Sequence, residues 1–339
     1  MSFTKVINHS NRLLSRSFAT SATIKMSVKP RHLVSISDLT NAEFNSLVDR
    51  AAYHKSLIKA GGKPSSEISQ ALSGKLVALL FSKRSTRTRI SSEGAAVYFG
   101  GHPMFLGKDD IQLGVNEAFY DTIKVVSSMT SCIFARVNSH SDIKQLCEHS
   151  SVPIINSLCD MYHPLQAIAD LLTIKETFGE IKGLKLTWVG DSNNVINDLA
   201  VACVRLGINV AVATPAGIEF NSEIASKCNE IGKETGASLL LTHDPVEAVK
   251  NTNIIVTDTF VSMGQEAETK EKLKKFEGFQ VTNDLAIKGG AKPDWKFMHC
   301  LPRHHDEVDD EVFYSDRSIV FPEAENRLYA AIAAIEGFV

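Results

Sequence analysis

Short runs rich in β-branched residues alternate with longer amphipathic stretches along this chain, from about residue 31 onward. Residues 74–81 are typical of a buried strand, and residues 86–99 after them predict a helix that ends at two glycines. Such alternation favours parallel strands joined by crossover helices, because parallel neighbours cannot be joined by a tight hairpin. The pattern therefore predicts an α/β fold.

The predicted strands fall into two groups along the chain. The first group comprises residues 74–81, 131–136 and 152–156, and the second comprises residues 184–190, 209–213, 238–242, 253–257 and 296–300. A chain of 339 residues exceeds the roughly 250–300 residues at which a single hydrophobic core stops growing. We therefore expect two doubly wound parallel-sheet domains, which bind ligands beyond the carboxyl ends of their strands.

The expected domains are residues 32–166, completed by a C-terminal helix at 322–339, and residues 167–321. A helix over residues 163–178 would join them, and the last helix is expected to begin after Pro322, a residue suited to a first helical turn. We expect the functional site between the two domains, where ligand sites commonly lie.

Residues 1–31 differ in composition from the rest of the chain. No acidic residue precedes Asp38, whereas Arg12, Arg16 and several lysines are basic, with many serines and threonines between them. This composition is typical of a mitochondrial transit peptide, and the apolar run is too short for a secretory signal. A disordered basic leader is the alternative. The transit peptide predicts a location in the mitochondrial matrix.

Charge and hydropathy argue against several other classes of protein. The net charge of -3 at pH 7, without a basic cluster, argues against nucleic acid as the main partner. The longest apolar stretches, such as residues 76–81, are far shorter than the roughly 18 residues of a membrane-spanning helix, so no membrane is expected as a partner. The six cysteines form no C-x-x-C pair, and we interpret them as reduced thiols.

Hydroxyl and guanidinium side chains cluster where the first predicted strand turns into its helix, in the sequence Ser85-Thr86-Arg87-Thr88-Arg89. The free N–H groups and the positive dipole end of a helix start favour an anion. Arginine binds phosphate oxygens in pairs, so this segment suits a phosphate group. A capped helix with a solvated basic face is the alternative interpretation.

This segment resembles the carbamoyl-phosphate loop shared by the aspartate and ornithine carbamoyltransferases. Three further motifs of that family follow in its order: Ala135-Arg136, His163-Pro164-Leu165-Gln166 and His299-Cys300-Leu301-Pro302-Arg303. The resemblance covers about residues 31–339, nearly all of the chain that follows the leader. An ordered set of motifs is far more specific than any one of them.

The resemblance implies a set of residues that bind carbamoyl phosphate. They are Ser85, Thr86, Arg87, Thr88, Gln112, Arg136, His163, Gln166, Cys300, Leu301 and Arg327. Arg87, Arg136, His163 and Cys300 would be catalytic, the first three by polarising the carbonyl oxygen on which negative charge develops. The family assembles as homotrimers, and Gln112 would reach the site of a neighbouring subunit.

The second half of the chain carries the expected acceptor site. The segment from Asp258 through Ser262, Met263 and Gly264 resembles the D-x-x-x-S-M-G loop of the ornithine enzymes, with Phe260 where that family has tryptophan. By this resemblance Asn194 and the Met263 backbone would hold the carboxylate of ornithine, and Asp258 would hold its α-ammonium, with Ser262 alongside. The loop offers no basic residue for the second carboxylate of aspartate.

The implied reaction is attack by the δ-amine of L-ornithine on carbamoyl phosphate. It gives citrulline and phosphate, as in arginine biosynthesis and the urea cycle, and needs no metal or organic cofactor. Another acceptor, aspartate or acetylornithine, is the closest alternative. A non-catalytic homologue that regulates another enzyme is the other alternative, and such a partner could also accompany catalysis.

Cys300 has three interpretations from sequence. A thiolate beside Asp258 and His299 would favour the reactive geometry of the δ-amine, whereas a covalent cysteine nucleophile is the rival role. A zinc site built from His299, Cys300, His304 and His305 has weaker support, because adjacent residues on a strand face opposite sides.

Overall fold

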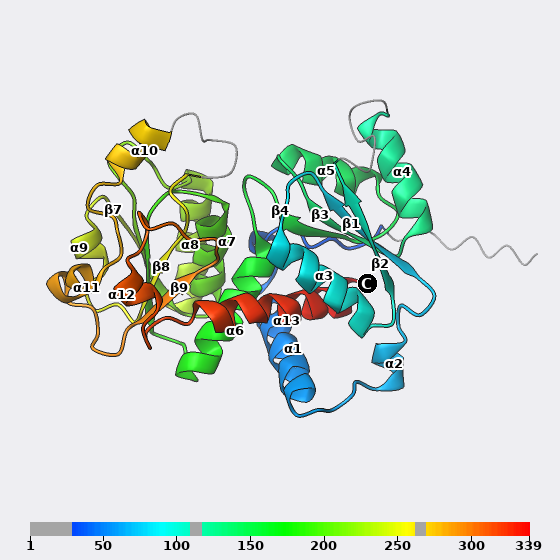
Figure 1. Cartoon of the computed structure of the whole chain (residues 1–339), viewed down its shortest axis with the longest axis horizontal. Helices are drawn as coiled ribbons and strands as arrows, with labels where there is room; N and C mark the ends of the chain where they lie inside the picture. The colour runs from blue at the N-terminus through cyan, green and yellow to red at the C-terminus, as the bar shows by residue number, and fades with distance from the viewer. Residues whose placement is uncertain (1–28, 109–116, 262–268) are drawn as a thin grey trace, which may run out of the picture.

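The computed structural model describes residues 29–108, 117–261 and 269–339. These residues form two halves, each built around a parallel β-sheet (Figure 1). The first sheet contains β1 (Leu76–Phe81), β2 (His102–Gly107), β3 (Cys132–Arg136) and β4 (Ile154–Leu158), in the order β2-β1-β3-β4. The chain crosses from one side of β1 to the other, so the strand order reverses between β1 and β3. Open α/β sheets bind ligands at such a switch point.

The second sheet has five strands in the order β7-β6-β5-β8-β9. They are β5 (Lys185–Val189), β6 (Asn209–Ala213), β7 (Leu239–Thr242), β8 (Ile254–Thr257) and β9 (Lys296–His299). Here the order reverses between β5 and β8. Both sheets therefore have their switch points at the strands whose carboxyl ends carry the predicted site motifs.

Helices connect the strands and cover the sheets. In the first half these are α3 (Thr86–Tyr98), α4 (Phe119–Met129) and α5 (His140–His149). In the second half they are α7 (Asn194–Arg205), α8 (Ser222–Thr235), α9 (Pro245–Ala248), α10 (Thr269–Lys275), α11 (Asn283–Gly289) and α12 (Asp310–Phe313). Strands β3 and β8 are buried along their whole length, as expected for parallel strands covered on both faces.

Three long helices join the halves: α1 (Asn41–Lys59), α6 (Pro164–Phe178) and α13 (Val320–Phe338). Short helices η1 (Ile36–Asp38) and α2 (Ser66–Ser69) flank α1. Helix α13 packs against α6, α3 and α1, so the chain returns to the first half after completing the second sheet (Figure 1). The first eleven residues of α6 are all buried. A helix that is buried on every side serves as a shared core element.

The predicted two-sheet α/β fold is confirmed, and every predicted strand is present with ends shifted by at most two residues. Strand β2 was not predicted. It is an edge strand that contains Pro103 and no β-branched residue, and a proline inside a strand is tolerated mainly at such an edge. The last helix was predicted to begin after Pro322, but it begins at Val320. Pro322 lies in the first turn, where backbone N–H groups have no helical partner.

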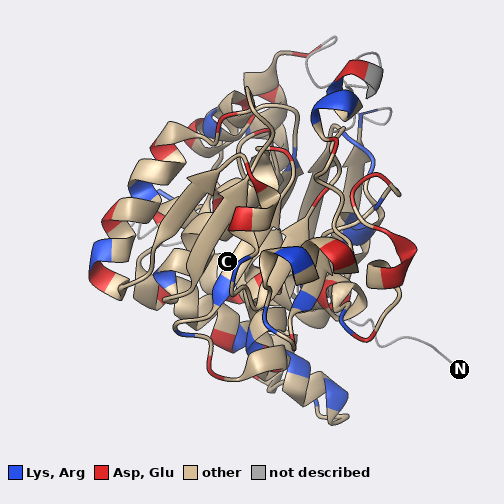
Figure 2. Cartoon of the chain, turned by 90° about the vertical axis from the view of Figure 1, so that its left-hand side faces the viewer, with Lys and Arg blue, Asp and Glu red and all other residues tan. Residues whose placement is uncertain are grey.

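Acidic and basic residues are interspersed along the helices in the view of Figure 2. This mixture agrees with the net charge of -3. Among the described parts of the chain, no helix is both long enough and apolar enough to cross a bilayer.

Candidate active site

The β1–α3 connection forms the expected helix start. Ser85 is the N-cap of α3, and its side-chain oxygen accepts a hydrogen bond from the Thr88 backbone N–H at 3.3 Å. Thr86 and Arg87 occupy the first turn, which contains no acidic residue, and Thr88 is buried. This arrangement combines a helix N-terminus with a cation, as an anion site requires.

Three buried side chains from different elements complete the basic cluster: Arg136 at the end of β3, His163 at the N-cap of α6 and Arg327 in α13. Within the described residues, Arg136 Nε, His163 Nδ1 and Arg327 Nε are buried without a hydrogen-bond partner. A buried polar atom without a partner is costly, and such atoms in native proteins point to a ligand or a functional role.

Burial determines the charge state of this cluster. Burial, followed by the charges of Arg327, Arg136 and Arg87, holds the pKa of His163 well below its usual value, so the imidazole is neutral at pH 7. Burial, together with neighbouring arginine charges, lowers the pKa of Arg136 and of Arg327 to about 10. Both guanidiniums thus remain charged at neutral pH. Adjacent like charges in a buried place favour an anion between them.

Gln166 and Arg327 connect this cluster to the helix start. Arg327 donates through Nη1 to Gln166 Oε1 at 2.6 Å and through Nη2 to the Thr88 hydroxyl at 3.2 Å. The N–H of His163 donates to Asp198 Oδ2 at 2.7 Å, which ties the start of α6 to helix α7 of the second half. The predicted residues of α3, α6 and α13 are therefore brought together.

Arg87 and Leu301 make a direct contact between the two halves. The Arg87 guanidinium donates through Nη2 to the Leu301 carbonyl oxygen. Leu301 has a φ of 61° and precedes a cis peptide bond to Pro302. A left-handed conformation is unfavourable for a branched residue and turns its carbonyl out of the strand direction. The Leu301 N–H donates to His299 Nδ1 at 2.9 Å, which holds the turn in place.

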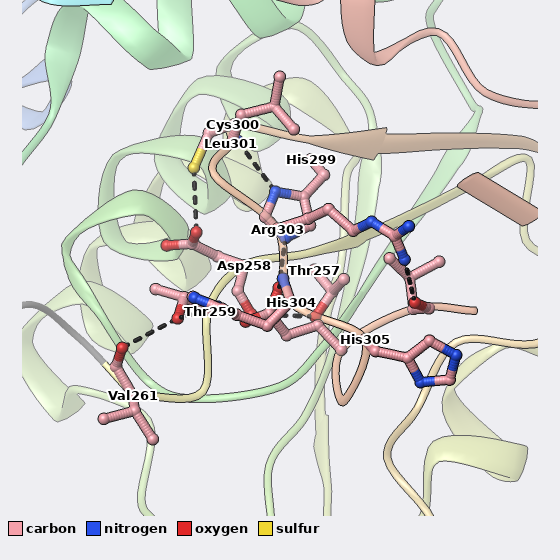
Figure 3. A network of polar contacts seen from close by, with 12 residues as sticks. Thr257, Asp258, Thr259, Val261, His299, Cys300, Leu301, Arg303, His304 and His305 are labelled. Carbon is pink, nitrogen blue, oxygen red and sulfur yellow. Dashed lines mark hydrogen bonds and ion pairs between the residues drawn. The ribbon is translucent and has the colours of Figure 1, made fainter. Parts of the chain in front are cut away.

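Cys300 and Asp258 face each other at the ends of β9 and β8 (Figure 3). The thiol donates to Asp258 Oδ1 at 3.1 Å. Burial, followed by the charge of Asp258, raises the pKa of Cys300 well above its usual value. The thiolate expected from sequence is therefore wrong for this structure, because the sulfur is a neutral thiol held by a carboxylate. A neutral thiol also makes a poor covalent nucleophile.

Asn193 was missed by the sequence analysis. Its Oδ1 accepts from the N–H groups of Val195 and Ile196 as the N-cap of α7, and its Nδ2 donates to Asp258 Oδ2 at 2.8 Å. Because the oxygen is used by the cap, the amide nitrogen must face Asp258. An asparagine immediately before a helix is a capping signal that could have drawn attention to it.

Asn194 has a different contact from the one expected. Its Nδ2 donates to the Cys159 carbonyl oxygen at 2.6 Å, in the connection between β4 and α6. Its predicted role toward a carboxylate is neither supported nor opposed by this bond. Gln112, Ser262 and Met263 lie outside the described residues.

A metal-ligand set at this place differs from the one considered from sequence. The ligand atoms of Asp258, His299 and Cys300 all lie within 4.8 Å of one another. The expectation that adjacent His299 and Cys300 face opposite sides is wrong, because β9 ends at His299 and Cys300 lies in the turn. His299 uses Nδ1 for Leu301 and Nε2 for Glu307, and the Cys300 thiol donates to Asp258, so these groups are already engaged with protein partners.

His304 and His305 do not join that set. His304 Nδ1 contacts Glu307 Oε1 at 2.9 Å, and Gln280 donates to the His305 backbone carbonyl. A surface hollow lined by Lys185, Asn209 and Lys292 lies at the opposite, amino-terminal edge of the second sheet and shares no residue with the site.

Comparisons with known proteins agree with the geometry. The family model of the aspartate/ornithine carbamoyltransferase carbamoyl-P binding domain matches residues 31–176, and the model of the Asp/Orn binding domain matches residues 182–336. The chain belongs to the aspartate/ornithine carbamoyltransferase family. It is a carbamoyltransferase enzyme.

Several relatives of the chain carry the name of the ornithine enzyme. "Ornithine transcarbamylase, mitochondrial" of Pachysolen tannophilus is 61% identical, with 96% of this chain and 93% of the relative covered. "Ornithine carbamoyltransferase" of Saccharomyces cerevisiae is 57% identical, with 91% of this chain and 94% of the relative covered. The crystal structure of a mitochondrial ornithine carbamoyltransferase from Coccidioides immitis has a TM-score of 0.86 at 56% identity, covering 91% of this chain and 98% of that one.

Proposed function

We propose that this enzyme transfers the carbamoyl group of carbamoyl phosphate to the δ-amine of L-ornithine, giving L-citrulline and phosphate. The observation that carries this function is the contact of Arg87 with Leu301, which joins the anion site of the first half to the Cys300–Asp258 pair of the second half. A donor with a phosphate and an acceptor with an ammonium group would then meet at one place. The reaction belongs to arginine biosynthesis and the urea cycle.

Carbamoyl phosphate would bind across the α3 start and the buried cluster. Ser85, Thr86, Arg87 and Thr88 would hold the phosphate, with Gln112 of a neighbouring subunit. The phosphate would neutralise the facing guanidiniums, which are costly to bury together. Leu301 and Gln166 each have a carbonyl oxygen that can accept from the carbamoyl amino group.

Attack creates negative charge on the carbonyl oxygen. Arg87, Arg136 and His163 would stabilise that charge, and the neutral imidazole of His163 would act as a hydrogen-bond donor rather than as a second cation. The nitrogen lone pair of the neutral δ-amine forms the new C–N bond. The tetrahedral intermediate then expels phosphate with the C–O bonding pair, and the ammonium proton leaves with the phosphate or solvent.

Ornithine would bind by its two opposite charges. Asp258 would take the α-ammonium, while Asn194 and the backbone of Met263, with Ser262 alongside, would take the carboxylate. Cys300 would contribute to catalysis by orienting the δ-amine of ornithine. Its hydrogen is committed to Asp258, so the sulfur lone pairs are free to accept a hydrogen bond from the δ-amine and aim the nitrogen lone pair at the carbonyl carbon.

We also propose domain boundaries, an assembly and a location for this enzyme. We assign residues 32–166 with 322–339 to carbamoyl phosphate, and residues 167–321 to ornithine, which is consistent with the packing of α13 on α3. A homotrimer is supported by Ile90, Val97 and Met104, exposed apolar residues on α3 and β2, two elements that pack together. The location is mitochondrial, as in the names of several relatives, and we assign residues 1–31 to targeting to the matrix.

Competition between acceptors tests the function. The purified enzyme is given carbamoyl phosphate with equal amounts of ornithine, aspartate and acetylornithine, and the products are separated by mass spectrometry. Citrulline should account for nearly all carbamoyl transfer. Carbamoyl-aspartate or acetylcitrulline as the main product would reject ornithine as the acceptor, and no product at all would reject catalysis.

A further inference from the structure

Two buried acidic residues lie directly behind Gln166, in positions that the mechanism above does not use. Asp170 is one turn further along α6, and Glu323 is in the first turn of α13; both are almost completely buried. Gln166 Nε2 donates to Asp170 Oδ1 at 2.7 Å and to Glu323 Oε1 at 3.1 Å. Glu323 Oε2 accepts from the His299 N–H at 2.9 Å. Glu323 thus contacts both the side chain of Gln166 and the end of the strand that leads to Cys300.

Because Asp170 Oδ1 and Glu323 Oε1 both contact Gln166 Nε2, the two buried carboxyl groups lie within reach of each other. An ionised carboxylate can only accept, so a hydrogen bond between two carboxyl groups requires that one of them carry a proton. Burial, followed by the charge of the partner, raises the pKa of Glu323, and burial also raises that of Asp170. Burial thus favours a single negative charge on the pair, and a second charge is favoured only as the pH rises.

Other titratable groups that face the pair come from several elements. They are Arg327 on α13, Asp258 at the end of β8, Cys300 after β9 and Cys203 on α7. Arg327 is the cation among them, so its charge favours a single negative charge on the pair. A second negative charge, created by loss of the shared proton, would be balanced by no other cation among these groups.

The carboxyl pair, together with Arg327, determines how the Gln166 amide is turned. Both donor hydrogens of Gln166 are used by carboxyl oxygens, so Oε1 must point the other way, toward Arg327 Nη1 and the basic cluster. An amide oxygen accepts hydrogen bonds and would recognise an N–H of the donor substrate. A reversed amide would present hydrogens instead and would repel the carbamoyl amino group.

We propose that Asp170 and Glu323 share one proton and are positioning residues that fix Gln166 as the acceptor for the amino group of carbamoyl phosphate. This inference rests on the proposed function and adds a specificity to it. The pair lets the site select a carbamoyl donor over an acetyl donor of the same shape, because a methyl group cannot donate to Gln166 Oε1.

Two stable analogues of carbamoyl phosphate measure how strongly the site prefers the carbamoyl amino group over a methyl group. Phosphonoacetamide carries the carbamoyl amino group, and acetonylphosphonate has a methyl group in its place. The ratio of their dissociation constants, measured by calorimetry without ornithine, reports recognition of the amino group alone. Ionisation of the phosphonate and of the arginines affects both ligands equally and cancels in the ratio.

Asp170→Ala should lower the preference for phosphonoacetamide by about tenfold or more, because Gln166 loses one of its two acceptors and can turn. Asp170→Asn should retain the preference, since its amide can donate to Glu323 and accept from Gln166 without any shared proton. Glu325→Gln, an exposed change on α13, is the control. Inorganic phosphate should bind all these proteins within about twofold of wild type, because it does not reach Gln166.

The pH dependence of the ratio of dissociation constants distinguishes a proton shared by Asp170 and Glu323 from a purely structural role of the two residues. The wild-type ratio should fall as the pH rises above about 7, because a second negative charge on the pair would push the two carboxylates apart and away from Gln166, whereas the Asp170→Asn ratio should stay flat. Parallel pH profiles of wild type and Asp170→Asn would overturn the shared proton. An unchanged ratio in Asp170→Ala, or an equal loss of inorganic phosphate binding, would overturn the positioning role. Citrulline synthesis by the wild type is measured beside these assays, and its absence would instead reject the proposed function.

Discussion

At the scale of single residues, Arg87 has two roles. It belongs to the anion site at the start of α3, and it donates to the Leu301 carbonyl of the second half. On substrate binding, the same guanidinium would be shared between phosphate and the developing oxyanion. Its role is therefore larger in the transition state than in the ground state.

Arg87→Ala should lower kcat by about 100-fold or more, as removal of an oxyanion donor does, with a higher KM for carbamoyl phosphate. Arg31→Ala, which removes an exposed arginine paired with Glu43, is the matched control and should leave kcat unchanged. Steady-state kinetics at saturating ornithine measure both. Near-normal kcat in Arg87→Ala would contradict the assignment.

Asp258 offers a second test at this scale. Asp258→Asn removes the charge expected to bind the α-ammonium of ornithine and one acceptor for Asn193 or Cys300. Ornithine affinity should fall by about tenfold or more, while phosphonoacetamide affinity should change by less than about threefold. Asp316→Asn, an exposed change in the same half, serves as control. An equal loss of both ligands would mean that Asp258 supports the structure of the whole site.

The residues that sequence alone could identify are those within short motifs. Arg87, Arg136, His163 and Cys300 stand at strand ends or helix starts, where local pattern indicates the chemistry. Asp170 and Glu323 could not be found in this way. Glu323 lies 157 positions from Gln166, and only the packing of α13 on α6 brings them together. The neutral state of the Cys300 thiol likewise depends on burial beside Asp258, which no motif reports.

At the scale of secondary-structure elements, helix α7 of the second half holds the start of α6. Asp198 is fully buried and accepts from the N–H of Ile36 at 2.8 Å and from the N–H of His163 at 2.7 Å. Asn197 donates to the Met161 carbonyl in the same connection. The position of His163 thus depends on a helix that carries no residue predicted to bind carbamoyl phosphate. Asn194, in the first turn of that helix, is predicted to bind ornithine.

Asp198→Asn should destabilise the protein by about 1–3 kcal/mol, because an amide has one oxygen for two N–H donors and leaves one of them unpaired. Burial raises the pKa of Asp198 to about 8. The stability from this carboxyl is therefore present below its unfolded pKa of about 4 and is lost as the pH rises through about 8. Urea unfolding across this pH range should show that loss in wild type and not in Asp198→Asn.

The control for that experiment is Glu223→Gln, an exposed acid-to-amide change on α8. It should leave the urea midpoint and its pH dependence unchanged. A stability of Asp198→Asn equal to wild type throughout would show that the two N–H bonds contribute nothing, and that the start of α6 is held by other contacts.

Most elements were predictable because parallel strands in a covered sheet are short apolar runs separated by helices. Strand β2 was not, because Pro103 and the glycine at its end are unusual for a strand, and only its edge position makes them acceptable. A C-terminal helix that completes the first domain was predicted at residues 322–339, but its start at Val320 depends on contacts that the local sequence does not show.

At the scale of the whole molecule, the site is assembled from both sheets, and we propose that a neighbouring subunit completes it through Gln112. Gln112→Ala and Cys300→Ala homotrimers should each have low activity. When the two are unfolded together and refolded, some sites of the hybrid trimers would receive an intact Gln112 and an intact Cys300. Activity should then rise above the average of the parents, in proportion to the hybrid fraction separated by ion exchange after charge-tagging one variant.

The control is each variant refolded alone, which corrects for losses during refolding. If Gln112 serves the site of its own chain, no mixture of these two subunits creates an intact site. Activity equal to the weighted parental average would therefore remove Gln112 from the site and with it the case for a shared site in a trimer.

We propose that this chain moves an intact carbamoyl group to the δ-amine of ornithine by cleaving the carbon–oxygen bond of carbamoyl phosphate. Carbamoyl phosphate with a heavy-carbon label in its carbonyl and a heavy-oxygen label in its bridging position tests this directly by mass spectrometry. After subtraction of the enzyme-free breakdown of carbamoyl phosphate, we expect heavy carbon in citrulline and heavy oxygen in phosphate, formed in equal amounts and only when ornithine is present. Labelled phosphate without labelled citrulline, or bridging oxygen that fails to appear in phosphate, would contradict it.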